Sequence, residues 1–140
     1  NVGPVVDFNV HFDPEAAYIT LKNANCPITI IPWETEEYDE LAQIKTKRGI
    51  FFKRITQILS DNRDRNTTEK GFTVGDLLLT TAFFYPEAIK RTQVWPATVE
   101  LHGQFTRGEL IPDKRLLFKT GVTFITRMSK NIVISKFKEL

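Results

Sequence analysis

A helix signal and a short apolar run decide the fold at residues 13–33, DPEAAYITLKNANCPITIIPW. Residues 13–15, Asp-Pro-Glu, combine an N-cap side chain, a proline suited to the first helical position and an acid in the first turn. This pattern predicts a helix that runs to about Asn23. The apolar, β-branched run at residues 26–33 predicts a buried strand of a parallel sheet. Helix, short turn and buried strand form half of an α/β repeat, so the sequence predicts an α/β fold.

The remaining chain carries further helix and strand signals. Apolar spacings of three and four predict helices over residues 38–44 and 50–59, followed by a polar loop at residues 60–71. A segment that is apolar nearly all round predicts a buried helix over residues 77–84, which ends before Pro86. Alternation then predicts an antiparallel hairpin near the C-terminus. Its strands are expected at residues 95–101 and 105–111, with another strand at 121–127 and a weak helical spacing over 133–140.

Composition excludes several classes of protein. The chain has 140 residues, 41% of them hydrophobic, which suffices for the core of one ordinary domain. No run of about 18 apolar residues exists, so we expect no membrane span. The single cysteine, Cys26, cannot form an internal disulfide. The first nine residues contain Gly3, Pro4 and three Asn or Asp residues, a pattern that we expect in the middle of a domain. The sequence does not indicate the compartment, since the sequon at residues 66–68 is a weak signal.

Few residues are candidates for chemistry, because the sequence has no P-loop, GxGxxG, HExxH or GxSxG motif. Asn1, Asp7 and Asn9 precede the first predicted helix, on an expected loop. Their donors and acceptors suit the vicinal hydroxyls of a sugar, or they cap turns. Asp76 stands at the start of an apolar helix, where the helix dipole favours an acid in any case.

The cationic residues favour ordinary surface roles. The pattern of residues 45–54 is that of a solvated helix face, with no aromatic residues interleaved as in a nucleic-acid-binding strand, so we expect no nucleic-acid partner. Arg107, His11 and His102 are expected to be surface or turn residues rather than ligands.

Taken together, the segments resemble the inosine-uridine nucleoside hydrolase family, in a form similar to its animal members. The resemblance runs in order through nearly the whole chain, and its motifs are Asn1, Asp7-Phe8-Asn9, Asp13-Pro14-Glu15-Ala16-Ala17, Pro27-Ile28-Thr29-Ile30, Pro32-Trp33-Glu34, Gly75-Asp76, Val99-Glu100-Leu101-His102-Gly103 and Thr106-Arg107-Gly108-Glu109. It implies a Rossmann-like nucleoside hydrolase fold, of which residues 1–140 would be the C-terminal portion of one domain.

The family's activity is the hydrolysis of the N-glycosidic bond of ribonucleosides with the help of a calcium ion. By resemblance, Asn1, Asp7 and Asn9 would bind the ribose, and Asp76 would bind both calcium and ribose. No residue is assigned to proton transfer. The resemblance implies a ribonucleoside substrate and allows a homo-oligomer. We expect neither a membrane nor a nucleic acid as a partner. These residues do not indicate which base the substrate carries.

Three departures from the family pattern keep an alternative open. The Asp-rich calcium cluster of the family is absent from these 140 residues, so we expect this chain alone to be inactive. Asp7 replaces a Glu and is one methylene shorter. Gly75 stands where other members have His or Trp, and glycine can neither donate a proton nor stack on a base. The alternative is a non-catalytic homologue that binds a ligand or a protein.

Overall fold

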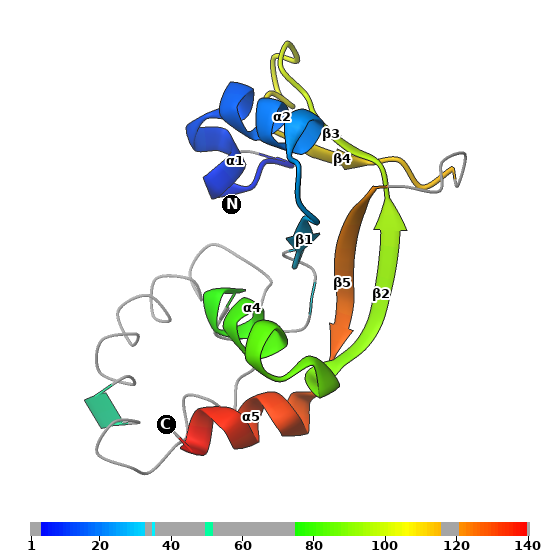
Figure 1. Ribbon diagram of the computed structural model, residues 1–140. Helices are drawn as coiled ribbons and strands as arrows, with labels where there is room; N and C mark the ends of the chain where they lie inside the picture. Colours follow the sequence, from blue (N-terminus) through cyan, green and yellow to red (C-terminus); the bar gives the residue numbers. More distant parts are fainter. Residues whose placement is uncertain (1–3, 33–34, 36–49, 52–74, 116–120, 140) are drawn as a thin grey trace. The chain divides into compact units, whose positions relative to one another are not determined.

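The computed structural model describes residues 4–32, 35, 50–51, 75–115 and 121–139 (Figure 1). Contacts between residues divide the chain into two compact units, which are described separately. The first comprises Asn1–Trp33 and Thr92–Ile125, and the second comprises Glu34–Arg91 and Thr126–Leu140. None of the described helices is both long enough and apolar enough to cross a membrane.

Two helices open the first unit. The short helix α1 (Phe8–Phe12) is followed at once by α2 (Pro14–Asn23), as predicted. The side chain of Asp13 accepts a hydrogen bond from the backbone nitrogen of Ala16 at 2.9 Å, which satisfies one of the free amides of the first turn. Pro14 is buried at the first helical position. The cap predicted from residues 13–15 is therefore confirmed.

A mixed three-stranded sheet has the order β1-β5-β2. Strand β1 (Thr29–Ile30) lies parallel to β5 (Val122–Met128), with Thr29 opposite Thr123 and Ile30 opposite Phe124. Strand β2 (Ile89–Trp95) runs in the opposite direction to β5 (Figure 1). The parallel pairing of β1 is confirmed, but the expected buried strand over residues 26–33 is wrong in length and burial. Thr29 is exposed, and β1, which comprises two residues, has a neighbour on one side only among the described strands.

The predicted hairpin is present with shorter strands. Strand β3 (Ala97–Val99) pairs with β4 (Leu110–Pro112) in antiparallel register, with Thr98 opposite Ile111. Pro96 separates β3 from β2, since proline has no amide hydrogen to donate to a ladder. Residues 101–109 form a turn-rich loop rather than the ends of two longer strands. Helix α2 packs against β3.

Three helical segments pack together in the second unit. Helix α4 (Gly75–Phe84) leads into the short helix η2 (Pro86–Ala88), and α5 (Lys130–Glu139) packs against both. The backbone nitrogen of Ser129 donates to the carbonyl of Ala88 at 2.7 Å. The expected helix at residues 77–84 is confirmed, but its complete burial is wrong. Leu78 is buried, whereas Phe83 is 78% exposed.

Each unit has its own buried apolar side chains. In the first unit they are Val6, Val99, Val122, Phe124 and Ile125, and in the second they are Leu78, Ala82, Ala88, Met128 and Val133. Two expected segments lie outside the described residues, namely the helix at 38–44 and the loop at 60–71. Of the helix expected at 50–59, only Ile50 and Phe51 are described, and both are helical and exposed.

Candidate functional site

Two candidate ribose-binding residues lie next to each other on α1. Asp7 is the N-cap of this helix, and its Oδ1 accepts a hydrogen bond from the backbone nitrogen of Asn9 at 2.9 Å. The expected loop is therefore a capped helical turn. Asp7 is half-buried and Asn9 is exposed. The cap fixes the backbone between the two side chains, so both project from a defined turn. Asn1, the third member of the expected cluster, lies outside the described residues.

Asp76 occupies the first turn of α4, in the second unit, and is exposed. Its backbone carbonyl accepts a hydrogen bond from the Oγ1 atom of Thr80 at 2.8 Å. The buried face of α4 is formed by Leu78, Thr81 and Ala82. Asp76 is not part of this buried face. Its place beside Asp7 and Asn9 in one site stays a prediction.

The described residues do not form a calcium site by themselves. No three His, Cys, Asp or Glu side chains gather among them in a way that could hold a metal ion. Calcium takes about six to eight oxygen ligands, so one carboxylate at Asp76 is insufficient. A calcium site that includes Asp76 needs oxygen atoms from elsewhere in the protein.

Gly75, the first residue of α4, is not crowded by the atoms around it. A Cβ atom placed on residue 75 would meet no heavy atom within 4 Å. The glycine is therefore not required by crowding on the described part of α4. Substitutions of Gly75 by residues with a side chain are therefore suitable for experiments on this position.

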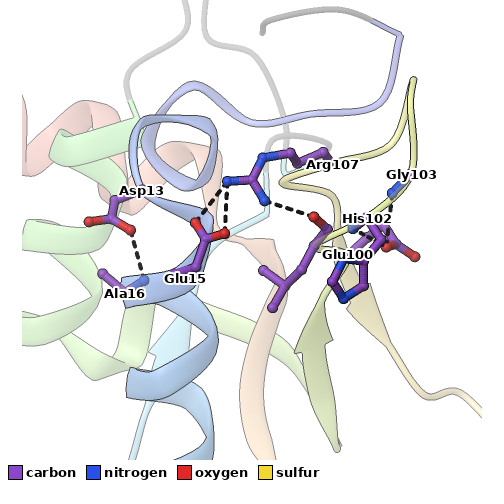
Figure 2. Close-up of polar contacts among 8 residues, drawn as sticks. Asp13, Glu15, Ala16, Glu100, His102, Gly103 and Arg107 are labelled. Carbon is purple, nitrogen blue, oxygen red and sulfur yellow. Dashed lines mark hydrogen bonds and ion pairs between the residues drawn. The ribbon is translucent and has the colours of Figure 1, made fainter.

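An ion pair joins the β3–β4 loop, residues 100–109, to α2 (Figure 2). The Nη2 atom of Arg107 lies 2.8 Å from both carboxylate oxygens of Glu15, and its Nη1 atom donates to the carbonyl of Leu101 at 2.7 Å. The hydrogen bond from Arg107 lowers the pKa of Glu15 below its ordinary value. Sequence reasoning assigned Arg107 to the surface and missed this pair. The two residues are 92 positions apart, so no local pattern could have indicated it.

A second carboxylate organises the beginning of the same loop. The Oε1 atom of Glu100 accepts hydrogen bonds from the backbone nitrogens of His102 and Gly103, at 2.7 and 3.1 Å (Figure 2). These bonds lower the pKa of Glu100. The imidazole of His102 is exposed, as is that of His11, which agrees with their expected positions at the surface.

Comparisons with known proteins agree with the resemblance. The model of the family "Inosine-uridine preferring nucleoside hydrolase" matches residues 1–137. Among solved structures, the chain is similar to an inosine-guanosine nucleoside hydrolase with a TM-score of 0.80 and 24% identity, over 99% of this chain and 47% of that one. It is also similar to a purine-preferring ribonucleoside hydrolase from Gardnerella vaginalis, with a TM-score of 0.76 and 20% identity, over 99% of this chain and 48% of the other. No curated protein sequence matches.

These comparisons establish the fold and the family. The chain spans about half the length of the solved structures that it matches. The α/β architecture of the described residues and the hairpin β3–β4 agree with the nucleoside hydrolase fold of these structures. The family match covers nearly every residue, including the candidate residues Asp7, Asn9 and Asp76. The chain belongs to the inosine-uridine preferring nucleoside hydrolase family.

Proposed function

We propose that the full-length protein containing this chain hydrolyses the N-glycosidic bond of ribonucleosides and releases ribose and a free base. The observation that carries this proposal is the family match over residues 1–137. The names of both similar solved structures describe nucleoside hydrolases, which supports the same reaction class. The base preference is left open, because these two proteins and the family name point to different sets of bases.

The capped turn of α1 supports recognition of the ribose. Asn9 is exposed and offers both an amide donor and a carbonyl acceptor, which suit a sugar hydroxyl. Asp7 uses Oδ1 to hold the backbone nitrogen of Asn9, and we assign its carboxylate a second task as an acceptor for a hydroxyl. Its shorter side chain brings the sugar closer to the helix backbone than a Glu would. Asn1 is proposed as a third ribose-binding residue.

We assign one calcium ligand to Asp76. Its carboxylate is a hard oxygen donor of the kind that calcium prefers, and it lies at an exposed helix start where no packing role competes. Because no group of potential metal ligands occurs among the described residues, the remaining ligands must come from other parts of the protein. Calcium takes about six to eight oxygen ligands and Asp76 supplies one carboxylate, so we expect the 140-residue chain alone to have no calcium-dependent activity.

A non-catalytic role is the second candidate, and Gly75 favours it. The position before Asp76 offers neither an acid nor an aromatic ring, so departure of the base receives no help from this residue. In this alternative the protein binds a nucleoside, a sugar or a protein partner and does not cleave a bond. The hydrolytic function requires the proposed ribose contacts. The non-catalytic role requires them only if its ligand is a nucleoside or a sugar.

One experiment distinguishes the two functions. Purified full-length protein is incubated with inosine and with uridine, with calcium and with a chelator, and released ribose is measured. We expect calcium-dependent release, and a strong loss in Asn9→Ala but not in Asn25→Ala, an exposed asparagine outside α1. Ribose binding without release would support the non-catalytic role. A protein that neither binds nor releases ribose would contradict the hydrolytic function and would restrict the non-catalytic role to a protein partner.

A further inference from the structure

The β3–β4 loop is held together by its own hydrogen bonds. The backbone nitrogen of Gly108 donates to the carbonyl of Glu100 at 2.7 Å, and that of Arg107 donates to Gly103 at 3.0 Å. The carboxylate of Glu100 adds two bonds at the start of the loop. These bonds join its two ends, so the loop is expected to move as one body.

Arg107 ties the β3–β4 loop to helix α2. Its guanidinium bridges the carbonyl of Leu101, inside the loop, and both oxygens of Glu15, in the first turn of α2 (Figure 2). A planar guanidinium with several N–H donors is suited to such a bridge, which a lysine cannot reproduce. The contact therefore couples the position of the loop to the start of α2.

Gly108, the next residue, lies against α1. It is buried and has a φ angle of +91°. A Cβ atom on it would approach Cγ1 of Val6 to 2.9 Å and Cα of His11 to 3.3 Å. Val6 precedes Asp7, and His11 follows Asn9. The backbone of the loop thus contacts both sides of the turn that carries the two candidate ribose-binding residues, and only glycine combines this φ angle with this closeness.

We propose that Arg107 is a positioning residue for ribose recognition: its bridge to Glu15 holds the β3–β4 loop in place, so that Gly108 supports the turn from Asp7 to Asn9. The role in ribose recognition rests on the proposed function, whereas the support of the turn does not. Arg107 acts through Gly108 and the backbone of α1 and needs no contact with the ligand.

The test uses Arg107→Gln and Glu15→Gln in the full-length protein, with Arg115→Gln as the matched control. Arg115 also binds a carboxylate, that of Asp113 at 2.7 Å, but this pair is two residues apart and joins no separate elements. Kinetics on inosine and the backbone amide NMR shifts of Asp7 and Asn9 are measured. Because this ion pair is exposed to solvent, its contribution is small, and we expect KM to rise up to about fivefold with kcat nearly unchanged.

Rescue separates positioning from a general loss of stability. The double variant Glu15→Arg with Arg107→Glu restores an ion pair of reversed polarity, and we expect it to recover part of the lost KM and of the Asn9 amide shift. Unchanged Asn9 shifts in both single variants would overturn the proposal, as would equal effects in Arg115→Gln. If one single variant fails to fold, the other decides.

Two of the measurements do not depend on the proposed function. Should the wild-type protein release no ribose, the amide shifts of Asp7 and Asn9 still test the support of the turn, and calorimetry with D-ribose tests the recognition. Changed shifts with unchanged ribose affinity would overturn the role in recognition. Changed shifts together with weaker ribose binding would support it without any catalytic activity.

Discussion

Gly121 lies directly against the backbone of Trp95, where a Cβ atom on residue 121 would overlap the Trp95 carbonyl group and the nitrogen of Pro96. This close approach occurs just before β5 begins and just where β2 ends. The ring of Trp95 also lies 5.4 Å from that of Phe124, measured between centroids. The beginning of β5 can therefore reach β2 only because residue 121 has no side chain.

We predict that Gly121→Ala strongly destabilises the protein. Backbone atoms cannot rotate away from the new methyl group as a flexible side chain could, so the strands must separate, at a cost of about 1–3 kcal/mol or more. Thermal and urea unfolding measure this loss. Gly75→Ala is the control, because its Cβ meets no atom within 4 Å and its effect should stay below about 1 kcal/mol. Equal stability of the two variants would contradict the contact.

Docking of the β3–β4 loop should weaken in acid. The pKa values of Glu15 and Glu100 are both lowered from 4.5, by hydrogen bonds that favour the charged carboxylate. A lowered pKa in the folded state means that the unfolded chain binds protons more readily. The stabilisation is therefore complete above about pH 4.5 and is lost as the pH falls through the folded-state values. The amide shift of Asn9, followed from pH 7 to pH 3, should report the change, and Glu15→Gln should remove part of it.

Calcium affinity should depend on Asp76. Asp76→Asn keeps the size of the side chain but removes a charged oxygen ligand, so we expect calcium binding to weaken about tenfold to a hundredfold. Calorimetry on the full-length protein measures the affinity. Glu87→Gln removes the same charge from an exposed position in the same unit and should leave calcium binding unchanged. An unchanged affinity in Asp76→Asn would contradict the assignment.

Departure of the base should limit the rate, because Gly75 provides no acid. General-acid help is typically worth about 10²–10⁴-fold, and p-nitrophenyl riboside, whose leaving group needs none, should be cleaved far faster than inosine. A Cβ atom on residue 75 meets no heavy atom within 4 Å, so Gly75→His should raise the inosine rate more than the p-nitrophenyl riboside rate, provided that the ring points at the base. Gly75→Gln controls for size. Equal rates on the two substrates in the native protein would mean that another residue protonates the base.

Local signals predicted helices α2 and α4 and strand β5 well, and helix α1 and strands β1 and β2 poorly. Residues 13–15 contain all the groups that cap α2, so the sequence alone indicated where this helix begins. Strand β2 was not predicted except for its last residue, Trp95, because Lys90 and its polar neighbours show no alternation. It forms beside β5, a partner far away in the sequence. Phe83 was expected to be buried, since an apolar helix does not reveal which of its faces finds a partner.

The candidate site was predictable only in part. Asp7 and Asn9 were recognised from their pattern, although the helix that they begin was read as a loop, because five residues are too few to show a helical period. The role of Gly108 could not be predicted, since its φ angle and its closeness to Val6 arise from packing between distant segments. Asp76 was placed correctly at the start of a helix.

Strand β1 has a consequence for synthesis of the protein on the ribosome. Its described partner, β5, follows about ninety residues later in the chain. At roughly 5–20 residues per second, the apolar segment around Ile30 is synthesised about 5–20 s before Phe124. During this interval the β-branched segment around Ile30 lacks its described partner β5. We expect cotranslational chaperones that bind short apolar stretches to select this segment, and slower translation between β1 and β5 to lower the yield of soluble protein.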